Sequence, residues 1–267
     1  AVTNVQSALN SDQRELNAQL ELNKNRLQVS GVATKLTDLT GNLNFRGGNL
    51  TTNDLSIEIE GERFKLNGQY KLAGATRDGN FSLKGTTTAQ YWLNLAAKLT
   101  ERPPPTEQWL DRISGKSQWT LGVKLHDKDP TQLSLTSSLA GISVELPAMF
   151  AKSRRSESPF SASIALHPDA PLQLGYGEFA RAAIALPSTA EAVAGISAVL
   201  GDGDVPPLAM GRWRIKGYVP RFDVSELHSV HSDQLGTDVD LSPVELDLEV
   251  GSLLIGAAQF DRVRFTL

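Results

Sequence analysis

Two pairs of residues near the C-terminus have spacings that occur in metal sites. His228 and His231 are three residues apart, so a short helix would bring both imidazoles to one face, where zinc can bind. Asp238 and Asp240 flank Val239 and carry the oxygen ligands that calcium prefers. The other histidines are scattered, and the remaining ligands of a calcium loop are absent. A solvated helix face and a polar loop explain these residues better, so no metal site is predicted.

A basic segment and two tryptophans are candidates for contact with lipid. Lys152, Arg154 and Arg155 lie at the centre of a polar loop, residues 147–159, and their charges can bind lipid phosphates. Trp92 and Trp109 can anchor at a membrane interface or line the path of a ligand. A solvated charged loop and the packing of helices on a sheet are the more common reasons for such residues.

The sequence shows no arrangement that supports catalysis. No glycine cluster has the spacing of a phosphate-binding or dinucleotide-binding loop. Gly201-Asp202-Gly203 is expected to follow a helix, so it is interpreted as a C-terminal turn. No serine lies in a G-x-S-x-G elbow. Most carboxylates fall on the polar faces of expected strands, where solubility explains them. We therefore predict a protein that is not an enzyme and that needs no cofactor.

Composition excludes several other classes of function. The net charge of −4 gives no global field that would attract nucleic acid, so none is expected as a partner. The absence of cysteine excludes disulfides and thiolate chemistry. No apolar run approaches the roughly 18 residues that a membrane helix requires. The chain begins with Ala1 and carries no signal peptide, so we expect a fragment of a longer protein.

The stretch from Leu36 to Leu72 alternates apolar and polar residues in three short runs. A strand sends alternate side chains to opposite faces, so each run has one apolar and one polar face. Gly41 and Gly68 each occupy one of the positions at which the alternation would place an apolar residue. Residues 46–49 and 60–63 are expected hairpin turns. The apolar positions of the three runs are Leu39, Leu43 and Phe45; Leu55, Ile57 and Ile59; and Phe64, Leu66, Tyr70 and Leu72.

Most of the chain repeats this pattern, which predicts about fifteen strands of average length. The expected fold is mainly β: a long twisted antiparallel β-meander that forms an open groove or taco-like curved sheet, with a few short helices. A turn is expected at Asp78-Gly79-Asn80, and residues 1–12 are expected to be a short helix or a frayed end. The expected segments are a meander over 1–87, a helical insertion over 88–115 and a second meander over 116–267.

Helical spacing appears in a few places only. Thr88–Leu99 and Thr106–Ile113 show it on either side of Pro103-Pro104-Pro105, which interrupts the insertion. Ser188 and Glu191 have capping-box spacing, which predicts a helix over 188–200. Asp223 and Glu226 predict a second short helix over 223–231.

Several segments together resemble a known family. The block L-x-x-L-x-G-x-L-x-F from Leu36 to Phe45, followed by F-K-L-N-G from Phe64 to Gly68, resembles the AsmA-like superfamily. Three further pieces are similar to its YhdP branch, and their order makes the resemblance fairly specific. They are Gly141–Ala148 with the lysine-containing loop and Pro159-Phe160, then Ile215–Asp223, and then Val244–Gly251 with Leu253 and Phe260–Phe265.

The resemblance implies a location and a task. Members of this branch are large Gram-negative proteins anchored in the inner membrane, and their periplasmic part resembles a bridge-like lipid transfer protein. It therefore implies a periplasmic segment that conducts phospholipids between the inner and outer membranes. The expected partners are phospholipid acyl chains and, through the full-length protein, both membranes.

Physical reasoning agrees with this implication. Too few helices are expected to cover the apolar face of so many strands, so the sheet must pair with another sheet or remain an open trough. In a trough, acyl chains would form the missing layer, although core packing explains any single residue equally well. The expected wall consists of Leu20, Leu22, Leu43, Phe45, Ile57, Ile59, Leu66, Tyr70, Leu121, Val123, Leu135, Val144, Leu246 and Leu248.

The alternative function is a structural or assembly scaffold, or a chaperone for outer-membrane proteins. Exposed edge strands would then pair with a strand of the client protein. The shape of the apolar face distinguishes the two hypotheses. An open trough favours lipid transfer, whereas a filled sandwich with an accessible edge favours a scaffold.

Overall fold

The structure is a computed structural model, and it forms two compact units that we describe separately. The first comprises residues 1–107 and 116–137, and the second comprises residues 108–115 and 138–267. The described residues are 2–8 (backbone only), 15–28, 35–71, 78–100, 111–146, 149–167, 169–186, 194–225 and 244–267.

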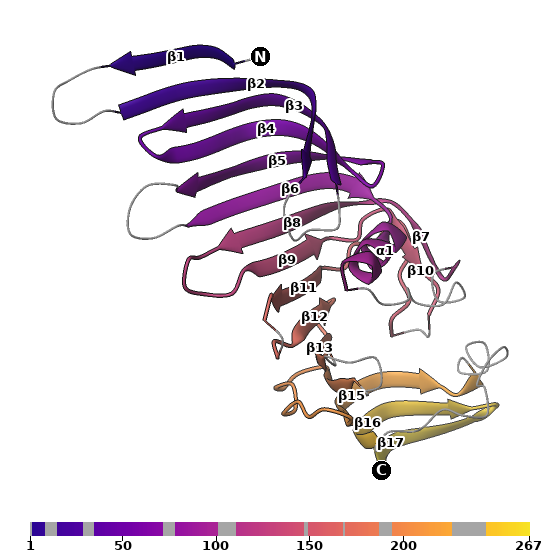
Figure 1. The fold of residues 1–267 in the computed structure, drawn as a ribbon. Helices are drawn as coiled ribbons and strands as arrows, with labels where there is room; N and C mark the ends of the chain where they lie inside the picture. Colours follow the sequence, from indigo (N-terminus) through magenta and orange to yellow (C-terminus); the bar gives the residue numbers. More distant parts are fainter. Residues whose placement is uncertain are drawn as a thin grey trace. The chain divides into compact units, whose positions relative to one another are not determined.

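The first unit is one open sheet whose strands follow one another in sequence order (Figure 1). Every neighbouring pair is antiparallel. Its strands are β1 (Val2–Ala8), β2 (Glu15–Gln28), β3 (Lys35–Arg46), β4 (Asn49–Ile59), β5 (Glu62–Lys71), β6 (Gly79–Thr87), β8 (Ser117–Leu125) and β9 (Gln132–Ser137).

The two predicted hairpin turns of this unit are confirmed. Gly47 and Gly48 have φ values of 52° and 77°, and Glu60 and Gly61 have values of 48° and 84°. Positive φ at both central residues is the geometry that matches the right-handed twist of the flanking strands. The turns therefore fix a register that keeps the apolar positions of β3, β4 and β5 on one face.

Irregular positions bend the first strands without reversing their faces. Lys24 in β2, Asp38 in β3 and Asp54 in β4 have φ between 52° and 62°, and the strand pairing shifts beside each of them. The side chain of Asn67 accepts a hydrogen bond from the Asp54 amide at 2.8 Å, which compensates for the interrupted ladder. An extra residue of this kind increases the local twist and bends the strand. Because Thr52 and Leu55 are three residues apart across the bulge, both still face the apolar side.

Helix α1 (Ala89–Thr100) confirms the first half of the predicted helical insertion. The hydroxyl of Thr88 accepts a hydrogen bond from the Tyr91 amide at 3.1 Å, which caps the first turn. Tyr91 and Trp92 pack against the buried Phe64, with ring centroids 5.7 Å from it in each case. The Tyr91 hydroxyl donates to the Ile59 carbonyl oxygen at 3.0 Å, so the helix is fixed over one end of the sheet.

The second unit contains a mixed sheet and a small two-stranded sheet. In the mixed sheet, β14–β15 and β15–β16 are parallel, and the other neighbouring pairs are antiparallel. The strands in order are β11 (Phe160–Ala165), β12 (Leu172–Tyr176), β13 (Ala180–Ala185), β14 (Gly195–Leu200), β15 (Trp213–Asp223), β16 (Val244–Ile255) and β17 (Ala258–Thr266). The small sheet pairs β7 (Ile113–Gly115) with β10 (Ile142–Val144).

The predicted fold class, mainly β with an open sheet, is confirmed, but the purely antiparallel meander is not. Parallel neighbours need a crossover of about a dozen residues or more. Residues 201–212 connect β14 to β15, and the longer segment 224–243 separates β15 from β16. Because β15 is parallel to both β14 and β16, it runs in the opposite direction to that expected for a meander.

The helix predicted over 188–200 is wrong for residues 195–200, which form β14. This strand has β13 on one side and β15 on the other, so both of its edges are hydrogen-bonded. Ser197 and Val199 are fully buried on one face, while Ile196 is half-buried on the other. Burial on both faces removes the alternation that would have indicated a strand. Residues 187–193, which include the predicted cap, lie outside the described residues.

Three smaller expectations also need correction. Residues 2–8 form β1 rather than a helix or a frayed end, because β2 supplies their hydrogen-bonding partners. Gly79 and Asn80 belong to β6, so the turn expected at 78–80 is wrong. Ile113 lies in β7 rather than at the end of a helix, because its partner Val144 provides a strand to pair with. Residues 101–110 lie outside the described part of the chain.

Replacing Phe64 tests the core beneath α1. Phe64 is 2% exposed, so Phe64→Ala removes a buried ring and should lower the free energy of unfolding by about 3 to 5 kcal/mol. The measurement is denaturant unfolding followed by circular dichroism. Lys84→Ala, on the exposed polar face, is the control and should change stability by less than about 0.5 kcal/mol. Equal effects of the two substitutions would contradict this assignment of the core.

Candidate functional site

The apolar face of the first unit is continuous from strand to strand. Leu20 pairs with Leu43, and Leu43 with Thr52. Further along the sheet, Phe81 pairs with Val123, and Val123 with Leu133. A second row runs through Leu66, Leu83, Leu121 and Leu135. Rows of aliphatic side chains therefore cross the strands, and they form a wall that is perpendicular to the chain direction.

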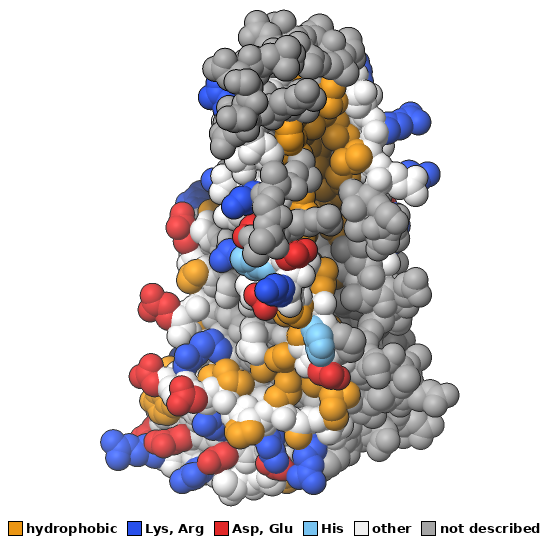
Figure 2. Space-filling model, turned by 60° about the vertical axis from the view of Figure 1, so that its left-hand side comes forward, with side chains coloured by type: hydrophobic (Ala, Val, Ile, Leu, Met, Phe, Trp, Pro, Cys, Tyr) orange, Lys and Arg blue, Asp and Glu red, His pale blue; other side chains and the backbone are white. Residues whose placement is uncertain are grey.

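This wall has a covered end and a less covered end. Towards α1, Leu55, Ile57 and Phe64 are at most 2% exposed. Towards the hairpin at Gly47-Gly48, Leu43, Phe45 and Leu50 are only half-buried, although Thr52, the partner of Leu43, is 2% exposed. Figure 2 shows hydrophobic side chains gathered in a hollow at the height of the first strands. The described strands of the first unit form a single sheet, so no second sheet of this unit packs on this end of the wall.

Eleven of the predicted wall residues lie in the first unit, and the structure places them on this one face. Two of them, Ile57 and Ile59, are buried in the cluster under α1, where protein already covers them. The others are half-buried. They are Leu20, Leu22, Leu43, Phe45, Leu66, Tyr70, Leu121, Val123 and Leu135.

The second unit has a comparable face that includes two of the remaining three residues. Leu246 pairs with Ile215, and Leu248 with Gly217, in half-buried rows that continue into β14. The structure does not place Val144 with them. It lies in β10 of the small sheet and is 7% exposed, so it belongs to a local core. Its alternating sequence is that of a strand, but the alternation does not specify which sheet the strand joins.

Sequence reasoning missed several residues on the same face of the first unit. Leu50 pairs with both Phe45 and Tyr70, and Leu133 pairs with Val123. Phe81 also pairs with Val123, and Leu125 pairs with Gly79. All four have the parity of their predicted neighbours, so extending each alternation to the end of its strand would have found them.

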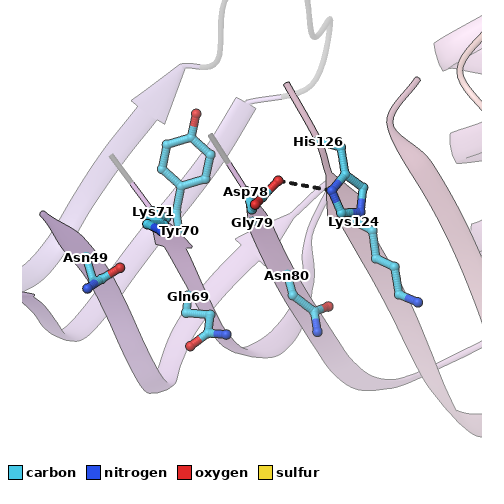
Figure 3. A pocket seen from close by; sticks show the side chains of 9 residues that line it. All are labelled: Asn49, Gln69, Tyr70, Lys71, Asp78, Gly79, Asn80, Lys124 and His126. Atoms are coloured by element: carbon cyan, nitrogen blue, oxygen red, sulfur yellow. Dashed lines mark hydrogen bonds and ion pairs between the residues drawn. The ribbon is translucent and has the colours of Figure 1, made fainter. Parts of the chain in front are cut away.

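The opposite face of the first unit is polar and includes an open pocket. Its lining includes Gln69, Asn80 and Lys124, which point to the same side and away from the Tyr70 ring (Figure 3). At its rim, His126 Nδ1 lies 3.0 Å from an oxygen of Asp78, and both side chains are about half exposed. Most of the lining lies on the polar side of the strands, but Tyr70 of the apolar wall and its partner Gly79 also line the pocket, so the pocket reaches the wall at this end of β5 and β6. Its composition is that of a solvated sheet face.

The structure gives Lys152 a different role from contact with lipid phosphates. Its ammonium is buried and donates hydrogen bonds of 2.9 Å to the carbonyl oxygens of Ile142 and Ser153. Burial lowers the pKa of this group. Arg154 donates to the Ser114 hydroxyl at 3.2 Å, while Arg155 is exposed. Lys152 therefore fastens its loop to β10, and its charge is not available at the surface.

Ion pairs organise the polar face of β15, β16 and β17. Arg214 donates to Glu245 at 2.8 Å, and Arg264 donates to Asp247 at 2.8 Å. These hydrogen bonds lower the pKa of both carboxyl groups. Exposed pairs of this kind contribute little stability, but they keep charge on one side of the sheet. The apolar and polar faces are therefore clearly separated in this unit as well.

The structure does not test the metal-ligand spacings noted near the C-terminus. His228, His231, Asp238 and Asp240 lie outside the described residues, as does Trp109. Within the described ranges, no three His, Asp or Glu side chains lie close enough together to hold a metal ion. Trp92 packs against Trp119 and Phe64, which is the expected packing of a helix on a sheet. In the same ranges, no helix is both long and apolar enough to cross a membrane.

The comparisons with known proteins give one match. The family model described as YhdP protein matches residues 4–267, which is nearly the whole chain. No curated protein and no solved structure matches. The resemblance seen from Leu36–Phe45 to Phe260–Phe265 therefore extends over residues 4–267, and the chain belongs to the YhdP family.

Proposed function

We propose that this chain is a segment of a bridge-like lipid transfer protein, located in the periplasm and belonging to a protein anchored in the inner membrane. Phospholipids would move between the inner and outer membranes with their acyl chains against the apolar wall. Membership of the YhdP family supports a role in lipid transport at the cell envelope. The observation that carries the proposal is the row that joins the half-buried Leu20 and Leu43, through Thr52 and Gly68, to the half-buried Phe81 and Val123.

The energetics of such a wall fit acyl chains well. Each methylene removed from water contributes roughly 0.8 kcal/mol, so one chain of many methylenes would be held without any charged contact. The ligand would also shield side chains that the protein leaves partly in water. Transfer of this kind makes and breaks no covalent bond, so it needs no catalytic residue.

The distribution of polar groups supports the same function. Charged side chains lie on the face opposite the wall, as Lys65, Lys84 and Lys124 do in three neighbouring strands. A phospholipid could therefore keep its head group in water beyond the ends of the strands while its chains lie on the apolar side. The wall has no polar group that could pair with a phospholipid head group. It would therefore bind acyl chains and exclude charged head groups.

The scaffold hypothesis receives less support. It requires a filled core with an accessible strand edge, whereas the hairpin end of the first unit leaves an apolar face half-buried. The lipid-transfer proposal therefore depends on whether phospholipid occupies that apolar face in the cell.

Photo-crosslinking tests this occupancy directly. We expect benzoylphenylalanine at Phe45 or Val123, in the protein as the native cell produces it, to form adducts with phospholipid on irradiation. The matched controls are Asn44 and Lys124, which adjoin the two probes in sequence but face the polar side. Mass spectrometry of the purified adducts identifies the lipid. Adducts at none of the wall positions, or equally at the controls, would contradict the proposal.

A charge placed in the wall should empty it. Phe45→Glu introduces a carboxylate that an acyl chain cannot solvate, so lipid crosslinking at Val123 should fall at least about tenfold, the factor that corresponds to 1.4 kcal/mol. Phe45 lies at the hairpin end of the wall and is only half-buried, so the fold should persist, which circular dichroism can verify. Asn44→Glu, one residue away on the polar face, should leave crosslinking unchanged. A folded Phe45→Glu protein with normal crosslinking would show that lipids do not use this wall.

A further inference from the structure

Aromatic side chains and glycines alternate on the apolar face of β5 and β6 in a reciprocal pattern. Gly68 pairs with Phe81, and Tyr70 pairs with Gly79. Each aromatic residue of one strand therefore lies opposite a glycine of the other. In β5 the sequence is Gly68-x-Tyr70, and in β6, which runs in the opposite direction, it is Gly79-x-Phe81.

Each ring occupies the space above the glycine that it faces. A Cβ atom at Gly79 would lie 2.7 Å from Cδ2 of Tyr70 and 3.1 Å from Cε2 of Phe81. At Gly68, an added Cβ would meet the Phe81 ring and lie 2.7 Å from the Asn80 carbonyl oxygen. Real Cβ atoms essentially never come within 3.0 Å of another heavy atom, as they would at the Tyr70 ring and the Asn80 carbonyl oxygen, so both rings can lean across the neighbouring strand only because the glycines have no side chain.

The same arrangement occurs once more, under the helix. Phe64 leans across Gly85, where an added Cβ would lie 2.5 Å from Cδ1 of the ring. There the ring is buried by Tyr91 and Trp92 of α1. Tyr70 and Phe81 are instead half-buried, on the part of the wall that α1 leaves less covered. At that end, a ring that leans sideways leaves the space above the wall free.

We propose that Gly79 and Gly68 set the clearance of the apolar wall by letting the Tyr70 and Phe81 rings lie across the sheet rather than stand out from it. This inference rests on the proposed function, and it adds the residues that decide whether an acyl chain can pass between β3 and β8. A larger residue at position 79 would raise the Tyr70 ring into the path of the chain.

Gly79 is the position at which this can be tested without disturbing the backbone. All three atoms nearest to its added Cβ belong to side chains, those of Tyr70, Phe81 and Leu125. At Gly68 the near atoms include backbone. Gly122 in the neighbouring strand β8 is a matched control, because its added Cβ would lie 2.6 Å from the Ser134 hydroxyl and would meet no other atom within 3.4 Å. It faces the polar side of the sheet.

The experiment combines these variants with crosslinking probes at Phe45 and Val123, on either side of the Tyr70–Gly79 pair. In Gly79→Val, phospholipid adducts should fall at least about tenfold at whichever probe lies beyond the constriction. Gly122→Val should leave both probes unchanged. The double variant Gly79→Val with Tyr70→Ala should restore the lost adducts, because the obstructing ring has been removed. Thermal unfolding of each variant verifies that the fold persists.

The outcomes separate this inference from the proposed function. Normal adducts at both probes in folded Gly79→Val would overturn the inference while the wild-type adducts still support lipid transfer. A loss of adducts that Tyr70→Ala does not restore would also overturn it, because the ring would not be the obstacle. Absence of adducts in the wild-type protein would overturn both.

Discussion

An open sheet with one apolar face requires that something other than the sheet cover that face. Backbone hydrogen bonds satisfy the strands along their edges, but they do not shield the side chains that project from the surface. Among the described residues of the first unit, α1 covers the end that contains Ile57 and Phe64, and no other element covers the hairpin end. The rest of the wall must remain partly in water or be covered by a ligand, and at about 25 cal/mol per Å² of apolar area a ligand has much to gain there.

The covering requirement explains why the strands maintain their faces so strictly. A slip of one residue would exchange the apolar side for the polar side. The bulges at Lys24, Asp38 and Asp54 are therefore placed so that each bends its strand and still returns the next apolar residue to the same side. The tight turns at 47–48 and 60–61 have the same effect at the strand ends. The bulges and turns thus curve the strands while keeping the apolar side chains on one face, so the hollow has a continuous apolar lining.

Local alternation was sufficient to predict most of the strands and which of their side chains share a face. Leu43 and Phe45, or Leu121 and Val123, could be assigned to one face because a strand has a period of two residues. The same reasoning failed where tertiary context decides the outcome. Residues 195–200 are buried on one face and half-buried on the other, so apolar residues occur on both faces and the apolar stripe resembles that of a helix. The crossovers that make β15 and β16 parallel to their neighbours leave no local mark at all.

Single residues with two common roles were the other source of error. Glycine in Asp78-Gly79-Asn80 suggested a turn, but at position 79 it provides space for the Tyr70 ring within a strand. Val144 has the right parity for the wall and lies in another sheet. Lys152 has the right charge for a phosphate, but two backbone carbonyl oxygens accept its hydrogen bonds inside the protein. In each case the deciding partner is distant in sequence or belongs to the backbone, so composition and spacing could not identify it.

The direction of the wall relative to the strands affects how a bound chain could move. Rows such as Phe81, Val123 and Leu133 cross the strands, and successive strands are about 4.8 Å apart. A chain that advances along the wall exchanges one aliphatic contact for a similar one at every step. Its total burial, and hence its binding free energy, changes little along the way. A ligand that passes along a path must bind well enough to enter it, and successive sites must bind it about equally well so that it can leave. A repeated apolar row meets both conditions. A single charged or specific site in the row would bind more tightly and would hold the chain in place.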